Sequence, residues 1–199
     1  MRNTLKFLTV FAIAFMVAFT VSNDATAQRK RKTIGKKMDT PFSQKRYKTD
    51  KKAFRAIGNG KSRKERSAML KARTDAQRKL AEEMKAVVKT VTEEYMKEYE
   101  VGDTYEFQSM MENKTIVAAK ASISGASEMD SEVYTIKQKK NGEKFILFNA
   151  YVVLEMDKET FKQKLNNEVM KEKKNEVEFS KEKFNEIFDK EMESLESEM

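Results

Sequence analysis

The longest regular pattern of apolar positions in the chain runs from Ala68 to Tyr95. Apolar side chains recur there at every third or fourth residue, which is the spacing of one face of an α-helix, and the pattern ends before Gly102. The face consists of Ala68, Ala72, Ala76, Leu80, Met84, Val87, Val88, Val91 and Tyr95. Upstream, the stretch from Ser62 to Glu65 has the form of a capping box. We predict one long helix, capped by Ser62, whose alanine-rich first half lies close against a sheet.

A second pattern, with a period of two, predicts a β-hairpin. Residues 132–138 and 143–156 are strand-like and flank Asn141-Gly142, which is the strongest short hairpin signal. One face of the second strand is entirely apolar and consists of Ile146, Phe148, Ala150, Val152, Leu154 and Met156. The opposite face is only partly polar. We expect one face to bind the long helix and the other to meet a second layer or another protomer.

Weaker patterns surround these two elements. Residues 51–57 alternate like a short strand that is closed by Gly58-Asn59-Gly60, and residues 103–121 predict a helix that runs into a strand near residues 121–123. Asp157 begins a charged helical segment with a sparse apolar stripe, which either binds a partner or, after residue 173, is solvated. The patterns together predict an α+β fold in which a long helix packs on a small antiparallel sheet, followed by a charged C-terminal helix.

The first 27 residues have the order of a secretory signal peptide. Arg2 and Lys6 precede the apolar run of residues 7–21, and Ala25-Thr26-Ala27 forms a small-x-small cleavage pattern. We expect cleavage between Ala27 and Gln28. The alternative is a retained membrane anchor, but the apolar run is shorter than the ~20 residues that a helix needs to cross a bilayer.

The charge is distributed unevenly along the chain. Residues 28–66 carry 16 Lys and Arg against three acids, whereas residues 67–199 have a net charge of −6. Residues 28–50 are polar and basic, so we expect a disordered arm that ends where the folded part begins. The predicted organisation is a signal peptide over 1–27, a flexible basic arm over 28–50, an α+β domain over 51–157 and the charged helix over 158–199.

The basic arm is a candidate surface for binding an anionic membrane or polymer. Its candidate contacts are Arg29, Lys30, Arg31, Lys32, Lys36, Lys37, Lys45, Arg46 and Lys48. Each cation near an anionic surface adds about 1 kcal/mol, an attraction that salt screens. The alternative is a solvated tail without a ligand.

The composition argues against the common kinds of enzyme. The chain has no His and no Cys, which are the usual general base, metal ligand and thiolate nucleophile. Gly60-Lys61-Ser62 resembles the end of a phosphate-binding loop, but the position of its first glycine is occupied by Arg55. The paired acids Glu82-Glu83 and Glu93-Glu94 are read as solvated helix surface. We expect no enzymatic activity, no cofactor and no metal, and nucleic acid is not an expected partner.

Four short motifs, taken in order, resemble one protein family. They are Ala56-x-Gly58-x-Gly60, the alanine ladder that ends in Leu80-Ala81, residues 122–125 (SISG) and residues 148–156 (FNAYVVLEM). The chain resembles the small Helicobacter-type membrane-associated lipoprotein antigens over roughly residues 52–160, and is similar also to the amino-terminal domain of the flagellar T-ring protein. The resemblance implies a long helix across a small antiparallel sheet and an envelope role without known catalysis. The chain departs from the lipoproteins because it has no cysteine to lipidate.

These observations lead to one expected function and one alternative. We expect a non-enzymatic exported protein, periplasmic or associated with the outer membrane, that acts through protein-protein contacts with an envelope protein or with further copies of itself. The alternative is binding to an anionic membrane surface or polymer through the basic arm.

Overall fold

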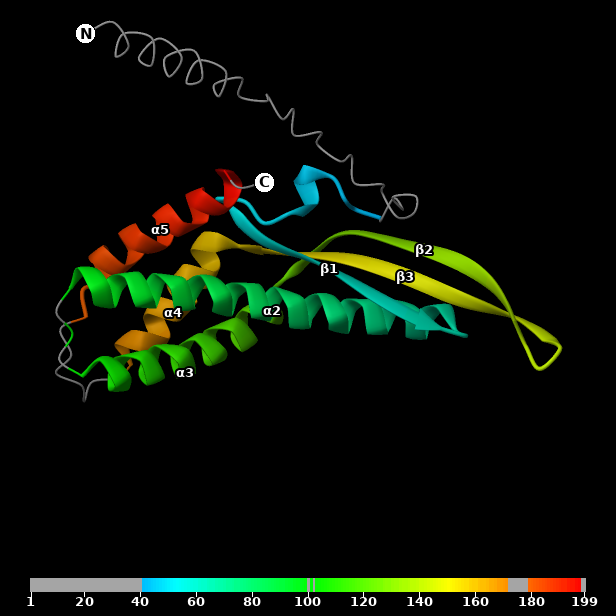
Figure 1. Cartoon of the computed structure of the whole chain (residues 1–199), viewed down its shortest axis with the longest axis horizontal. Helices are drawn as coiled ribbons and strands as arrows, with labels where there is room; N and C mark the ends of the chain where they lie inside the picture. The colour runs from blue at the N-terminus through cyan, green and yellow to red at the C-terminus, as the bar shows by residue number, and fades with distance from the viewer. Residues whose placement is uncertain (1–40, 100, 102, 172–178, 198–199) are drawn as a thin grey trace, which may run out of the picture. The chain divides into compact units, whose positions relative to one another are not determined.

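The computed structural model describes residues 41–99, 101, 103–171 and 179–197 (Figure 1). The elements in chain order are η1 (Lys45–Tyr47), β1 (Ala53–Ser62), α2 (Glu65–Glu98), α3 (Thr104–Ile123), β2 (Ser127–Lys140), β3 (Glu143–Asp157), α4 (Lys158–Met170) and α5 (Lys181–Ser197). The predicted α+β class is confirmed. Among the described residues, no helix is both long enough and apolar enough to cross a bilayer.

The sheet has three strands in the order β1-β3-β2, and both pairings are antiparallel. The predicted hairpin is confirmed: Asn141 and Gly142 have φ angles of 51° and 88°, as a type I′ turn requires. Its first strand is longer than predicted and begins at Ser127, with a bulge between Glu128 and Asp130. The central strand β3 therefore lies between a short partner, β1, and a long one, β2.

The long helix α2 packs on the sheet through its alanine-rich half, as predicted. Every residue of the predicted apolar face, from Ala68 to Tyr95, is buried. The predicted end of β1 at Ile57 is wrong, because the strand continues through Gly58 and Gly60 to Ser62. A Cβ atom on Gly58 would lie 2.0 Å from the carbonyl oxygen of Ala72. The glycines therefore serve close helix packing and do not form a turn.

The amino ends of two helices test the predicted caps. The residue that caps α2 is Lys64, and Ser62 belongs to β1, so the predicted capping box is wrong. Ser62 instead accepts a hydrogen bond from the Lys64 amide at 3.3 Å. Asp157 caps α4 as predicted, because its carboxylate accepts the Thr160 amide at 2.7 Å.

The predicted single C-terminal helix is wrong, since the segment contains the separate helices α4 and α5. Helix α5 runs beside α2, and Phe184, Ile187, Phe188 and Met192 are buried in the main core (Figure 1). The alternative of a solvated helix is therefore also wrong for α5. The strand predicted near residues 121–123 is wrong as well, because α3 remains helical to Ile123.

The other face of the sheet is covered by residues that were predicted to be disordered. Phe42 and Tyr47 are buried against Val153, and their rings meet edge to face at 4.8 Å between centroids. Residues 41–50 belong to the same compact unit as the sheet, so this unit does not begin at Lys51. The prediction of a flexible arm is therefore wrong for residues 41–50, which form the expected second layer.

Candidate functional site

Strands β2 and β3 extend beyond the end of β1 and form a projecting hairpin (Figure 1). The last pair between β1 and β3 is Ser62 with Phe148. On β2, Thr135 lies opposite Phe148, and we call residues 133–148, which start two residues before that position and include the hairpin beyond it, the outer hairpin. An antiparallel pair without a third strand buries little of its side-chain surface.

Large apolar side chains lie exposed on both faces of the outer hairpin. On the face that continues the α2 side, Val133 is 36% and Ile146 is 49% exposed. On the opposite face Tyr134 is 45% exposed, and Ile136 and Leu147 are half-buried neighbours. Contiguous exposed apolar side chains on a soluble domain are typical of a contact surface.

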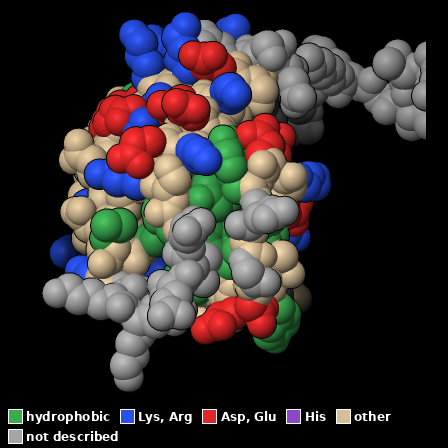
Figure 2. Space-filling model, turned by 90° about the vertical axis from the view of Figure 1, so that its left-hand side faces the viewer, with side chains coloured by type: hydrophobic (Ala, Val, Ile, Leu, Met, Phe, Trp, Pro, Cys, Tyr) green, Lys and Arg blue, Asp and Glu red, His purple; other side chains and the backbone are tan. Residues whose placement is uncertain are grey.

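The body of the molecule presents a different surface. Figure 2 looks at the end formed by the carboxyl end of α2 and the amino ends of α3 and α5, where Lys or Arg and Asp or Glu side chains are interspersed beside a strip of hydrophobic side chains. Between α2 and α3, a cavity of ≈ 250 Å³ is lined by Lys85, Lys89, Thr92, Met111, Thr115 and neighbouring residues. Both threonine hydroxyls already donate to backbone oxygens of their own helices, Thr92 to Val88 and Thr115 to Met111. The buried hydroxyl groups of this cavity are therefore already bonded, and its charged residues, Lys85, Lys89 and Glu112, are exposed.

The free edge of β1 is closed at its amino end, away from the outer hairpin, by Thr49. The Thr49 hydroxyl accepts the Arg55 amide at 2.9 Å and donates to the Arg55 carbonyl oxygen at 3.3 Å. The Arg55 guanidinium is held between Asp50 and Glu155, at 2.7 Å and 2.6 Å. Both the backbone and the charge at this position are therefore satisfied within the molecule.

Side chains of α2 close the rest of the β1 edge. Lys79 donates to the carbonyl oxygen of Ile57 at 2.9 Å, Asp75 accepts the amide of Asn59 at 3.0 Å, and Lys71 donates to the carbonyl oxygen of Lys61 at 3.3 Å. Partial burial works to raise the pKa of Asp75, but hydrogen bonds from Lys79 and Arg78 outweigh it and lower that pKa to about 2. This edge is therefore blocked against pairing with another strand.

The free edge of β2 lacks such a cover. In an antiparallel sheet, the backbone groups of successive residues point alternately to the two neighbouring strands. The β1 residues Arg55, Ile57, Asn59 and Lys61 point away from β3, so their partners on β3 point toward β2. The pairing register of β2 then leaves four residues that point away from β3, which are Val133, Thr135, Lys137 and Lys139. Among the described residues, no hydrogen bond reaches the backbone groups of these four residues from another segment of the chain. At the start of this edge, the Ser131 amide is satisfied by Asp130 at 2.8 Å. The open stretch therefore runs from Val133 to Lys139.

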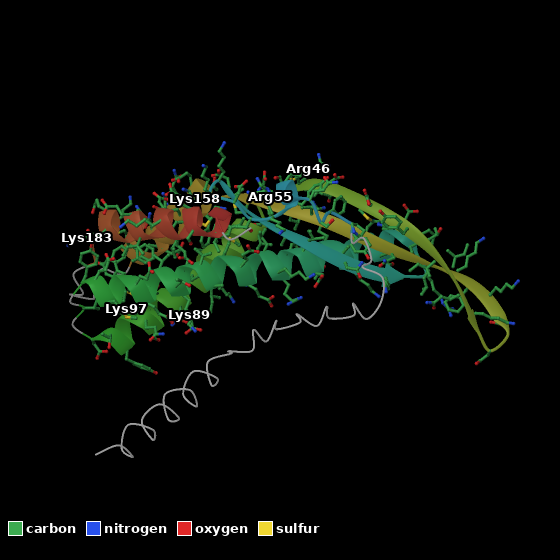
Figure 3. The ribbon with its side chains drawn as sticks, turned by 45° about the horizontal axis from the view of Figure 1, so that its top comes forward. Arg46, Arg55, Lys89, Lys97, Lys158 and Lys183 are labelled. Atoms are coloured by element: carbon green, nitrogen blue, oxygen red, sulfur yellow. The ribbon has the colours of Figure 1, made fainter. Side chains whose placement is uncertain are left out.

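Three of the candidate anion contacts, Lys45, Arg46 and Lys48, lie on or beside η1 and are exposed. Tyr47 anchors this turn, because its hydroxyl donates to Asp130 at 2.6 Å. The guanidinium of Arg46 lies 4.5 Å from the centre of the Tyr47 ring. Figure 3 shows Arg46 and Arg55 on the same side of the body, but Arg55 is already paired. The structure thus gathers three exposed cations on one anchored turn.

The remaining predicted site residues lie outside the described part of the chain. They are the cleavage residues Ala25, Ala27 and Gln28 and the cations Arg29, Lys30, Arg31, Lys32, Lys36 and Lys37.

A groove of ≈ 630 Å³ beside η1 contains the half-buried carboxyl group of Glu83. Burial raises the pKa of Glu83, and its contact with the Thr49 hydroxyl, whose single proton also faces the Arg55 carbonyl oxygen, works in the opposite direction. Within the described residues, no group of three Asp or Glu is placed to hold a metal ion. The Thr49 hydroxyl and the Lys79 ammonium group, which also line the groove, are both bonded to the backbone of β1.

Sequence reasoning missed the side chains that close the β1 edge. Thr49 was assigned to a disordered arm, and Asp75 and Lys79 differ in no visible way from the other charged pairs on α2. Only their i, i+4 spacing was visible in the sequence.

The outer hairpin, with its open β2 edge, and the cationic turn are thus the two candidate sites. The chain matches no family model, no curated protein and no solved structure, and we therefore infer its function from its own residues.

Proposed function

We propose that this chain is a non-enzymatic exported protein of the cell envelope that acts through protein-protein contacts. The observation that carries the proposal is the outer hairpin, on which the large apolar side chains Val133, Tyr134 and Ile146 are exposed. Burying each such side chain in a complex would contribute about 1.5 to 3 kcal/mol relative to leaving it in water. The sequence supports export through its signal-like first 27 residues, and the absence of His and Cys favours binding over catalysis.

Capture from envelope extracts tests the contact. The mature chain would be immobilised beside the variant Ile146→Lys and the control Leu70→Lys, which changes a comparably exposed apolar side chain on α2. We expect a partner that is retained by the unaltered chain and by Leu70→Lys but lost with Ile146→Lys. Equal capture by all three would mean that the outer hairpin is not the contact surface.

Export has its own test. Cells that produce the chain would be fractionated, and the amino terminus of the mature protein would be sequenced. We expect a periplasmic or outer-membrane fraction and a chain that begins at Gln28. A chain that begins at Met1 in the cytoplasmic fraction would contradict the proposal.

The anchored cationic turn favours a second candidate function, which is binding to an anionic membrane surface or polymer. Lys45, Arg46 and Lys48 are exposed and form no ion pair with another described residue. Cosedimentation with vesicles that contain anionic lipid would test it, with Lys45→Glu plus Lys48→Glu against the distant pair Lys89→Glu plus Lys97→Glu (Figure 3). We expect the first pair to weaken binding by roughly tenfold or more and salt to weaken it further. Binding that is insensitive to salt would contradict this candidate.

A further inference from the structure

The two free edges of the sheet differ, and the difference points to a partner. On β1 the outward backbone groups are closed by Thr49, Asp75, Lys79 and Lys71. On β2 the outward groups from Val133 to Lys139 are open. Unpaired strand edges are the usual sites of strand addition.

We infer that the open edge of β2 pairs antiparallel with the same edge of a second copy of this chain, across a two-fold axis. The inference rests on the proposed function, because it names the first partner of the outer hairpin. It applies the rule that a two-fold interface uses the same surface on both copies.

The charges along β2 favour this partner and this direction. The first half of the strand carries Glu128, Asp130 and Glu132, and the second half carries Lys137 and Lys139. Antiparallel pairing of two copies sets the acidic half of each strand against the basic half of the other. Parallel pairing would set like charges side by side, which is destabilising.

The open backbone groups also specify a register. A two-fold axis beside Ile136 pairs Val133 with the copy's Lys139 and Thr135 with the copy's Lys137, so that all four open residues find partners. Ile136 then lies opposite itself. Since Ile136 is opposite Leu147 within the hairpin, an apolar row of four side chains would continue across the junction.

An alternative interpretation of the lysines of β2 is that they prevent strand addition, as lysines on edge strands commonly do. In the register above, Lys137 and Lys139 lie opposite the uncharged Thr135 and Val133 of the second copy, so this pairing sets no like charges directly opposite each other. The same lysines disfavour a strand that brings cations to those positions.

Sedimentation of the mature chain at micromolar concentrations tests the pairing. Thr135→Pro removes an N–H that points away from β3, so the β2–β3 ladder keeps all of its own bonds. We expect the unaltered chain and the matched control Thr135→Val to reach twice the monomer mass. We expect Thr135→Pro to weaken dimerisation by about tenfold or more, because each copy loses a bond across the junction. Unchanged denaturation midpoints would show that both variants fold.

Single cysteines test the register, and they report cleanly because the chain has no cysteine of its own. Under mild oxidation, we expect Ile136→Cys to form a cross-linked dimer. Tyr134→Cys should not, because the two copies of that residue would be offset by about 13 Å along the strands. A mixture of Tyr134→Cys with Gln138→Cys should again form the cross-link.

Each outcome decides the inference. A chain that stays monomeric, or that dimerises equally well as Thr135→Pro without cross-linking through Ile136→Cys, overturns it. If the outer hairpin nevertheless captures an envelope protein in the Ile146→Lys comparison, the proposed function stands and only self-pairing fails. Dimerisation and cross-linking as described support self-pairing even if no envelope protein is captured.

Discussion

At the scale of single residues, the closest packing in the molecule joins the glycines of β1 to the alanines of α2. A Cβ atom on Gly60 would lie 2.3 Å from the carbonyl oxygen of Ala68, and one on Gly58 would lie 2.3 Å from the Ala76 amide nitrogen. Neither neighbour is a flexible side chain, so an added methyl group has to push the helix backbone away from the strand. At Gly58 and Gly60 the fold therefore requires the absence of a side chain more than it requires hydrophobic contact between β1 and α2.

Gly58→Ala should therefore destabilise the protein. Overpacking of this kind costs about 1 to 3 kcal/mol, which urea denaturation measures as a lower midpoint. Gly125→Ala is the matched control, because the nearest atom to its added Cβ is 3.6 Å away. Equal midpoints for the two variants would show that α2 can move away from β1 at no cost.

The carboxyl group of Asp75 makes stability depend on acid pH. Its folded pKa of about 2 lies below the ordinary value of 3.8, so its contribution is complete above pH 3.8 and is lost as the pH falls through 2. Allowing for solvent screening, we expect that contribution to be about 1 kcal/mol. Asp75→Asn should lower the free energy of unfolding by that amount at neutral pH and by progressively less as the pH falls through 2.

Glu82→Gln is the control for that measurement. Glu82 also pairs with Arg78, at 2.7 Å, but more than half of its side chain is exposed. The variant should change stability by a few tenths of a kcal/mol at most. A pH profile of Asp75→Asn that runs parallel to that of the unaltered chain would contradict the assignment.

At the scale of elements, the strongest periodic patterns gave the correct structure, and the errors have physical causes. Helix α2 and the hairpin were predictable because each repeats one period over many residues. The extension of β1 was not, because Gly58 and Gly60 have the same composition in a turn and in a closely packed strand, and only α2 distinguishes the two. The burial of α5 was not predictable either, since its partner surface comes from α2, which lies far away in the sequence.

The packing of α5 can be tested at Phe188. This side chain is fully buried, and its ring centre lies 6.4 Å from that of Phe54 on β1 and 6.3 Å from that of Phe161 on α4. Phe188→Ala should cost about 3 to 5 kcal/mol, because it removes a core ring and leaves a cavity. Met170→Ala, at an exposed position on α4, should change stability by less than about 0.5 kcal/mol. Equal denaturation midpoints for both variants would mean that α5 does not pack on the body.

At the scale of the whole molecule, the described residues belong to one compact unit in which the two faces of the sheet have different covers. Helix α2 covers one face, and the short segment around Phe42 and Tyr47 covers the other. From the sequence we expected a second layer or another protomer on this face, but we could not identify the residues that form it. Phe42 and Tyr47 lie among many cations, and no periodic apolar pattern marks them. The candidate site was still less predictable, because open and closed edges follow from pairing register and from distant side chains.

The closed edge of β1 also limits how far such a sheet can grow. If two copies join through β2, the outermost strand at each end of the shared sheet is a β1 in which every outward residue from Arg55 to Lys61 has at least one backbone group bonded by Thr49 or by a side chain of α2. A third copy would find no strand to extend. Assembly by strand addition would therefore stop at two copies. The closed edges of β1 would also prevent amyloid-like stacking, to which open-ended sheets are prone, along this direction.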